Sequence, residues 1–167
     1  RISGDAPLPV DPAIFSAQNE YLTLVGYDAP AIPAGSSDTF SMAWRIDAPP
    51  PFADFTPLIQ LEDRHGSVIY RGDVYMAGTD EWRTGDTLIQ RMTVAVPPAT
   101  PPGEYRVRIA WVGRASDHYV PYTGEGGEQG MVWAEIGTLA VTRPAAFPDP
   151  TSIPMDVRQP TEIAPGV

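Results

Sequence analysis

Proline and glycine interrupt this chain so often that long regular elements cannot form in it. The 167 residues include 20 prolines and 15 glycines, a combined share well above the ordinary total of about 12%. Proline donates no ladder hydrogen bond and disrupts the interior of helices and central strands. The prolines gather at PAIP, APPP and PPATPPG, where short apolar segments end. The sequence therefore predicts short strands joined by turns, with little or no helix.

Between these breaks, apolar and polar residues alternate with the period of a half-buried strand. Parity places Trp44 and Trp111 on inward faces, so both are predicted to lie in the core. Seven or so short strands are typical of an all-β, two-sheet antiparallel sandwich, immunoglobulin-like or fibronectin-III-like, with about seven to nine strands. The predicted strands cover residues 21–25, 40–46, 58–61, 67–70, 88–96, 105–111 and 132–142.

The length fits a single domain, since domains usually contain roughly 100–200 residues. We expect the sandwich to occupy residues 20–143. Residues 1–19 carry three prolines and are predicted to be an extended lead-in. Residues 144–167 are predicted to be a proline-rich tail or linker. Because the chain opens at Arg1 rather than at Met, we expect a mature form or a piece of a longer protein.

Charge and composition exclude several classes of function. Asp and Glu outnumber Lys and Arg by 21 to 11, which gives a net charge of −10 and disfavours nucleic-acid binding. The chain has no Cys, which removes disulfides, thiolate nucleophiles and Cys-ligated zinc. No apolar run approaches the roughly 18 residues of a membrane span. We therefore expect membrane attachment only through segments missing from this chain.

The tetrapeptide Asp63-Arg64-His65-Gly66 predicts a hairpin turn. Asp at its start and Gly at its end suit a type I turn closed by a residue with positive φ. Residues 67–70 would then form the return arm. His65 is accordingly expected to be a solvated turn residue rather than a catalytic base.

Three arginines, Arg45, Arg106 and Arg108, are predicted to project from the outer faces of strands. Cross-strand pairing with acids such as Glu62 or Glu135 is the expected role of these side chains. A site for an anionic ligand is the alternative.

Four residues are candidates for ligand contact. Trp82, Tyr119 and Tyr122 fall in predicted loops, and three rings at loop tips would suit a glycan because each offers apolar area at little entropic cost. Loop aromatics also cap the open ends of sandwiches, and this alternative remains open. The fourth candidate is His118. The carboxylate of neighbouring Asp117 could orient its imidazole ring, as carboxylates behind functional histidines do in many sites. Packing within the loop is its alternative role.

The sequence shows no set of catalytic residues. No Ser stands in a G-x-S-x-G context, and the acids Asp80, Glu81 and Asp86 match no calcium-loop spacing. The segment GEGGEQG at 124–130 lacks the Lys and the strand-to-helix context of a phosphate loop. We therefore expect no catalytic residue, metal or cofactor.

Several motifs together resemble a family of bacterial β-sandwich domains. These motifs are LVGYD, F-x-M-x-W, D-R-H-G, W-R-x-G-D and PPGEYRVRI, and the resemblance covers about residues 20–143. Such domains are common in Chloroflexi-type genomes, beyond the membrane part of protein-mannosyltransferase-type glycosyltransferases or in tandem in envelope proteins. The catalytic carboxylates of those enzymes lie in the membrane part, so the resemblance implies no catalytic residue here. A looser similarity, in strand order, is to the immunoglobulin-like proteinase-inhibitor domain of Bacillus.

The sequence thus predicts a non-catalytic, extracytoplasmic module of a larger bacterial envelope protein. The full-length parent could be a membrane glycosyltransferase. The module would serve as a spacer, a docking surface or a weak glycan binder, with a glycan or another envelope protein domain as partner. An immunoglobulin-like proteinase inhibitor is the alternative, and an enzyme is the third possibility. The sequence does not indicate an oligomeric state.

Overall fold

The computed structural model describes residues 11–12, 18–51, 54–73, 79–113, 118–123, 129–144 and 146. Within these ranges the one helix is the three-residue 3-10 turn η1 (Thr79–Glu81), and no helix there is long and apolar enough to cross a membrane. The strands are β1 (Asp11–Pro12), β2 (Leu22–Asp28), β3 (Ile32–Pro33), β4 (Ser37–Ile46), β5 (Phe55–Glu62), β6 (Val68–Asp73), β7 (Thr87–Ala95), β8 (Gly103–Gly113), β9 (His118–Val120), β10 (Tyr122–Thr123), β11 (Gln129–Met131) and β12 (Ala134–Thr142).

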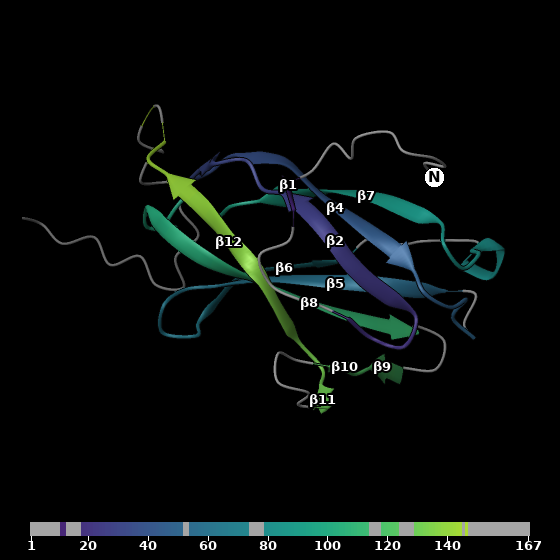
Figure 1. Cartoon of the computed structure of the whole chain (residues 1–167). Helices are drawn as coiled ribbons and strands as arrows, with labels where there is room; N and C mark the ends of the chain where they lie inside the picture. The colour runs from purple at the N-terminus through teal and green to yellow at the C-terminus, as the bar shows by residue number, and fades with distance from the viewer. Residues whose placement is uncertain are drawn as a thin grey trace, which may run out of the picture.

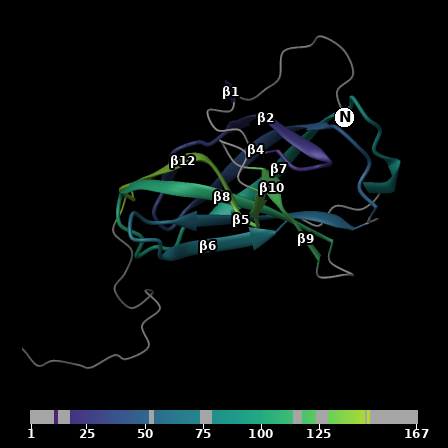
Figure 2. The same cartoon turned by 60° about the horizontal axis from the view of Figure 1, so that its bottom comes forward.

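The strands form a two-layer sandwich, as predicted (Figures 1 and 2). The first sheet has the order β1-β2-β4-β7, and the second has the order β3-β12-β8-β5-β6 with β9 also paired to β8. Strands β10 and β11 form a separate antiparallel pair. This arrangement follows the immunoglobulin-like plan, with strands A, B and E in one layer and C, F and G in the other.

Two short strands extend the sheets beyond the predicted set. Strand β3 pairs in parallel with the end of β12. Strand β1 pairs with residues 26–27 of β2, so part of the predicted lead-in lies against the first sheet. The predicted tail lies almost wholly outside the described residues.

The region after β8 differs from the sequence prediction, because Tyr119 and Tyr122 lie in strands β9 and β10 rather than in loops. The pairing of β12 with β8 begins at Ile109, which leaves the last residues of β8 without a partner from β12. Strand β9 pairs with this remaining stretch, residues 111–113. Strands β12 and β9 thus pair with successive parts of β8.

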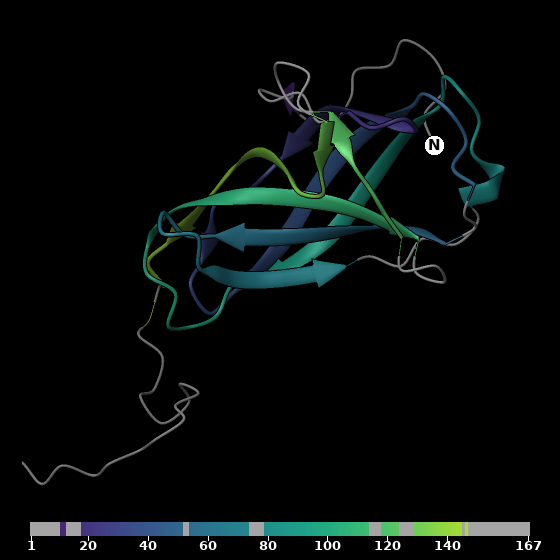
Figure 3. The same cartoon turned by 90° about the horizontal axis from the view of Figure 1, so that it is seen from below.

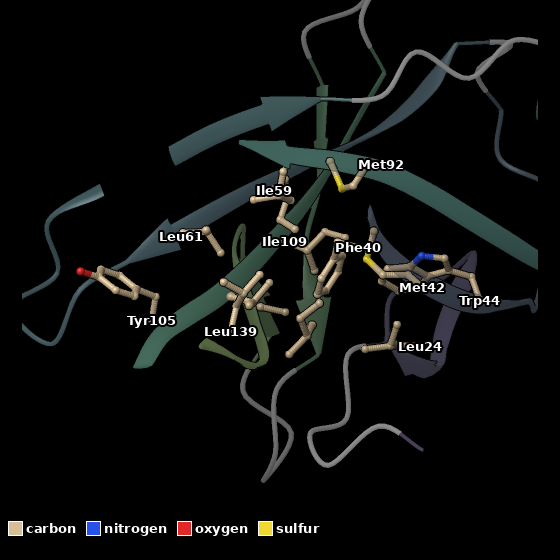
Figure 4. Packing of buried hydrophobic residues seen from close by; sticks show 14 of the residues in the cluster. Leu24, Phe40, Met42, Trp44, Ile59, Leu61, Met92, Tyr105, Ile109 and Leu139 are labelled. Atoms are coloured by element: carbon tan, nitrogen blue, oxygen red, sulfur yellow. The ribbon is translucent and has the colours of Figure 1, made fainter. Parts of the chain in front are cut away.

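The apolar core fills the space between the two sheets (Figure 4). Trp44 and Trp111 are both fully buried, which confirms their predicted inward orientation. Their rings meet edge to face with centroids 5.4 Å apart, and Phe55 stacks on Trp111 at 4.7 Å. Tyr105 lies at the opposite end of the core from Trp44, as Figure 4 shows.

The hairpin turn predicted at residues 63–66 is confirmed. Gly66 has a φ of +84° and donates its N–H to the carbonyl oxygen of Asp63 at 3.0 Å. The Asp63 N–H in turn bonds the Ser67 carbonyl oxygen at 2.9 Å. Strand β6 then returns antiparallel to β5, as expected for the second arm of a hairpin.

Tyr105 fixes the entry of the chain into β8. Its hydroxyl donates to the carbonyl oxygen of Pro101 at 2.7 Å, four residues upstream. This is the geometry of the tyrosine corner that immunoglobulin-like sandwiches use at the start of strand F. Burial of the ring, together with the charge of Asp63, raises the pKa of Tyr105. The bond therefore holds the segment 101–105 in place against the sandwich.

Removing this hydroxyl should measurably destabilise the fold. We expect Tyr105→Phe to lower the free energy of unfolding by about 1–2 kcal/mol, because the buried bond is lost and the Pro101 carbonyl loses its donor. Urea denaturation followed by far-UV circular dichroism measures the change. Tyr119→Phe is the matched control, since Tyr119 is 38% exposed, and it should change stability by less than about 0.5 kcal/mol. Equal effects of the two substitutions would contradict the role assigned to Tyr105.

Candidate binding face

The outer face of the second sheet, which is turned away from the first sheet, carries polar side chains from four neighbouring strands. Gln60 on β5 lies opposite Arg71 on β6 and opposite Arg108 on β8. Glu135 on β12 lies on the other side of Arg108. Figure 3 shows β5 and β6 running side by side with β8. We name the following residues the arginine cluster: Gln60, Glu62, Arg71, Arg106, Arg108 and Glu135.

The carboxylate of Glu62 is the centre of this cluster. The side chain is almost completely buried, and it accepts hydrogen bonds from Arg108 Nη1 at 2.9 Å and from Arg106 Nη2 at 3.1 Å. Gln60 Nε2 donates to the same carboxylate, and Arg71 Nη2 donates to Gln60 Oε1 at 2.7 Å. A continuous chain of hydrogen bonds therefore crosses from β6 to β8.

The predicted pairing of the outward-facing arginines is confirmed for two of the three. Arg106 and Arg108 both form cross-strand ion pairs with Glu62. Arg106 also lies within 4.0 Å of Glu135. Arg45 belongs to the first sheet instead and pairs with Asp47 at 2.7 Å, two residues along its own chain.

Glu62 is held in its ionised form. Burial alone would raise the pKa of its carboxyl, but hydrogen bonds from Arg108 and Gln60 and the charges of both arginines outweigh burial and hold the pKa below its ordinary value. The same charges keep the two guanidinium groups fixed above the sheet. The cluster is therefore preorganised at neutral pH.

The lowered pKa has a consequence for stability in acid. A carboxyl whose pKa is depressed by folding contributes stability above its unfolded pKa, and it loses this contribution as the pH falls through its folded pKa. We expect Glu62→Gln to cost about 1–3 kcal/mol at pH 7, because charged hydrogen bonds are lost, and to reduce the further loss of stability between pH 5 and pH 3. Urea denaturation at these pH values measures both effects.

Some acid sensitivity should remain in Glu62→Gln. Hydrogen bonds from Arg45 and Thr23 outweigh the effect of burial and lower the pKa of Asp47, and the backbone N–H of Ser67 lowers that of Asp63. Identical acid sensitivity in the variant and the parent would show that Glu62 makes no contribution to it.

An aromatic residue covers part of the arginine cluster. The guanidinium carbon of Arg71 lies 5.5 Å from the centre of the Trp133 ring, within the range of a cation–π contact. Arg108 Nη2 lies 3.4 Å from the Trp133 carbonyl oxygen. Strands β8 and β5 separate Trp133 from Arg71 in the sheet order, so this contact reaches across the face. Ala110 projects to the same side and is fully buried, which fits such a cover.

A cleft adjoins the arginine cluster at the end of the sandwich. It has a volume of about 430 Å³ and lies between the turn at 63–66 and the segment at 101–105. Arg106 Nη2 lies 3.9 Å from the position that a side chain at Gly66 would take, so this guanidinium borders the turn. The lining residues are Asp63, Arg64, His65, Pro101, Pro102, Gly103, Glu104 and Tyr105.

The groups in the cleft differ in how firmly they are held. Asp63 Oδ1 accepts the backbone N–H groups of His65 and Ser67, both at 2.8 Å, so this carboxylate stabilises the turn. Arg64 Nε donates to His65 Nε2 at 3.0 Å, and both of these side chains are exposed. The rings of the two prolines and of Tyr105 supply apolar wall. The cleft thus offers apolar surface beside both donors and acceptors.

The four residues nominated from the sequence do not form one site in the described part of the chain. The Trp82 ring is half-buried against Phe55 and Trp111, with centroids 6.3 and 6.2 Å apart, so it packs at the end of the core. Tyr119 lies opposite Val112, whose side chain belongs to the outer face. Trp82 and Tyr119 are therefore on opposite sides of the second sheet. His118 and Tyr122 belong to β9 and β10, but their side chains lie outside the described residues.

Sequence reasoning missed Trp133, Arg71 and the cleft. Trp133 lies in the predicted strand at 132–142, but its position there does not show that its ring reaches Arg71. That Arg71 shares a face with Gln60 and Arg108 follows only from the register of the hairpin, which the sequence does not give. The cleft brings together two turns, D-R-H-G at residues 63–66 and PPGEY at residues 101–105. These turns are far apart in the sequence, and neither carries a signal of their proximity. Among the described residues, no three His, Cys, Asp or Glu side chains gather as a metal site.

Comparison with known proteins concerns the fold. No protein-family model matches the sequence, and no curated protein matches it. Among solved structures, the C-terminal domain of wzt is 12% identical, with 77% of each chain covered and a TM-score of 0.48. The CARDB domain of the PF1109 protein from Pyrococcus furiosus, in complex with di-metal ions, is 11% identical, with 84% of this chain and 100% of that chain covered and a TM-score of 0.42.

A third similar structure is a Niemann-Pick type C2 protein from the Japanese carpenter ant. It is 10% identical, with 77% of this chain and 99% of that chain covered and a TM-score of 0.42. Likenesses this weak carry no information about ligands or activity. The resemblance to domains of membrane glycosyltransferases stays a prediction.

Proposed function

We propose that this chain is a non-catalytic binding module of a larger protein, and that it binds a glycan with the cleft and the adjoining arginine cluster. We further propose that it works outside the cytoplasm, in a bacterial envelope protein. The observation that carries the proposal is the cleft of about 430 Å³. Pockets for small ligands begin at about 300 Å³, so the cleft suits one or two sugar rings.

The chemistry of the cleft supports a sugar as ligand. A sugar hydroxyl both donates and accepts hydrogen bonds, and the cleft combines the carboxylate of Glu104 with the exposed side chains of Arg64 and His65. The rings of Pro101 and Pro102 offer flat apolar surface beside these groups. The faces of sugar rings carry C–H groups that can pack on such a surface.

The acidic residues near the cleft are better suited to a binding site than to a catalytic site. Asp63 is occupied by the backbone of its own turn. Glu62 is held ionised between two guanidinium groups, so it is a poor proton donor at neutral pH. These carboxylates shape and fix the site. The proteinase-inhibitor alternative stays a prediction, which a panel of serine proteases with excess protein would test.

A second candidate function is docking of a protein domain on the outer face. Val68, Tyr119 and Val132 are exposed large hydrophobic residues, and all three belong to the second sheet or to the segment entering β12. Tyr, Trp and Arg dominate the energetics of protein interfaces, and this face includes Arg71 and Trp133. The binding experiments below include an outcome that favours docking.

Isothermal titration calorimetry of the full chain with a panel of soluble polysaccharides tests the glycan proposal. We expect at least one polysaccharide to bind, and His65→Ala together with Glu104→Ala to weaken that binding about tenfold or more. Asp38→Ala is the control, because Asp38 is exposed on β4 of the first sheet. Failure of every polysaccharide to bind, or binding that survives the two substitutions in the cleft, would overturn the proposal.

A further inference from the structure

We infer that the glycan is acidic, and that Arg106 binds a carboxylate group of a sugar whose ring occupies the cleft. This inference rests on the proposed function. It is carried by the charge of the arginine cluster, by the unused donors of its guanidinium groups, and by the position of Arg106 between the cluster and the cleft.

The arginine cluster itself is positive on a strongly acidic protein, whereas the adjoining cleft carries the carboxylates of Asp63 and Glu104 beside the guanidinium group of Arg64. The cluster contains three guanidinium groups against the two carboxylates of Glu62 and Glu135. The whole chain carries a net charge of −10, which repels anions at long range. Physiological salt screens charges beyond about 8 Å. An anionic ligand is therefore recognised here by direct contact rather than by long-range attraction.

The guanidinium groups keep donors in reserve. Each has five N–H groups, whereas the hydrogen bonds within the described residues use one donor of Arg71, one of Arg106 and two of Arg108. The Arg106 side chain is 42% exposed, and within the described residues its Nη1 makes no hydrogen bond and lies 4.0 Å from a carboxylate oxygen of Glu135. Guanidinium groups bind carboxylates through two parallel hydrogen bonds. Arg106 has the donors for such a pair while it keeps its bond to Glu62.

Glu62 prepares Arg106 for this role. A free arginine side chain loses conformational entropy when it binds a ligand, at a cost of about 0.5–1.5 kcal/mol. Arg106 is already anchored by its bond to the buried carboxylate at 3.1 Å. Much of that cost is therefore incurred during folding rather than during binding.

The position of Arg106 links the cluster to the cleft. Glu104 lines the cleft, and Arg106 stands two residues further along β8, on the same face because strand side chains alternate. The Arg106 guanidinium also borders Gly66 of the turn that forms the opposite wall. A sugar ring in the cleft therefore lies close to the Arg106 guanidinium, to which we assign the ring carboxylate.

An acidic sugar explains these features better than an acidic peptide. One common mode of peptide binding adds a strand along an open sheet edge through main-chain hydrogen bonds, whereas this cleft lies between two turns. The cleft also offers separate donors and acceptors, which hydroxyl groups require and carboxylates alone do not. An acidic peptide is kept as an outcome of the test.

Polygalacturonate and fully methyl-esterified polygalacturonate form the decisive pair of probes, because they share one backbone and carry either ionised carboxylates or neutral methyl esters. We expect the full chain to bind the acidic polymer at least tenfold more tightly, measured by titration calorimetry at 150 mM NaCl. Arg106→Gln should remove about tenfold of this affinity, and Arg106→Lys should restore only part of it. Arg91→Gln is the matched control, because Arg91 is an exposed residue of β7 in the first sheet, and it should leave the affinity unchanged. Circular dichroism and urea denaturation confirm that each variant is folded.

Each other outcome decides a different question. Equal binding of the two polymers would overturn the acidic-sugar inference and leave the proposed function standing. Binding of polyglutamate but of no polysaccharide in the panel would overturn both and favour docking of an acidic protein segment. Binding of the acidic polymer that Arg106→Gln and Arg91→Gln weaken equally would overturn the assignment to Arg106. If none of the probes binds, both the inference and the proposed function are wrong.

Discussion

Trp111→Ala is expected to lower the free energy of unfolding by about 3–5 kcal/mol, the usual cost of removing a buried tryptophan side chain. Trp111 is fully buried. Its ring contacts Phe55, Trp44 and Trp82 with centroids 4.7, 5.4 and 6.2 Å away. The substitution leaves a cavity where both sheets and η1 meet. Because domains are stable by only about 5–15 kcal/mol, the variant should be close to unfolding at 37 °C.

Urea denaturation followed by far-UV circular dichroism measures this loss, since fluorescence would change with the number of tryptophans. Trp111→Phe keeps most of the buried volume and should cost less than the alanine variant, so the effect remains measurable if Trp111→Ala does not fold. Trp82→Ala is the matched control. Trp82 is half-buried at the edge of the same ring cluster, and we expect a loss of about 1–2 kcal/mol. A larger loss for Trp82→Ala than for Trp111→Ala would contradict this description of the core.

The longer strands and the core were predictable because their signals are local. The alternation that begins at Phe40 reports which side chains face inward, since a strand has a period of two residues. The same argument placed Trp111 correctly. The turn at residues 63–66 was predictable for a similar reason, because Asp63 and Gly66 have conformational preferences that do not depend on distant parts of the chain.

The candidate binding face was only partly predictable, because it depends on register between strands. Outward parity suggested that Arg106 and Arg108 meet acids, and Glu62 was among the acids named. Parity could not show that Glu62 is buried between both guanidinium groups, or that Arg71 joins them through Gln60. Trp82 illustrates the opposite limit. Its place in a predicted loop left two roles open, ligand contact or a cap on the core, and only the structure shows its ring packed on Trp111.

Folding and binding share residues on this face. Glu62 stabilises the sheet by joining β5 to β8, and the same bonds orient the donors assigned to the ligand. A substitution at Glu62 should therefore weaken stability and binding together. A substitution at Arg106 should affect binding more than stability, because Arg108 still pairs with the Glu62 carboxylate. Measuring both properties in both variants separates the anchor from the residue that contacts the ligand.

Gly137→Ala is expected to lower the free energy of unfolding by about 2–5 kcal/mol, from two separate causes. Gly137 has a φ of +152°, a conformation that costs a residue with a side chain about 1–3 kcal/mol. A β-carbon there would also collide with the hydroxyl and ring of Tyr27, which crosses from the first sheet. Overpacking of this kind costs about 1–3 kcal/mol. Tyr27 cannot move freely, because its ring stacks on Phe40 with centroids 5.9 Å apart.

Gly103→Ala separates the two causes. Gly103 has nearly the same backbone conformation, with a φ of +159°, but nothing lies within 4 Å of the position of its β-carbon. Urea denaturation should therefore show the smaller, backbone part of the loss for Gly103→Ala and the full loss for Gly137→Ala. In the double variant Tyr27→Ala/Gly137→Ala the collision is absent. Its loss of stability should therefore be smaller than the sum of the two single-variant losses by about 1 kcal/mol or more. Equal losses for the two glycine variants, together with strict additivity in the double variant, would show that Tyr27 does not press on Gly137 and that the contact between the sheets is looser than described.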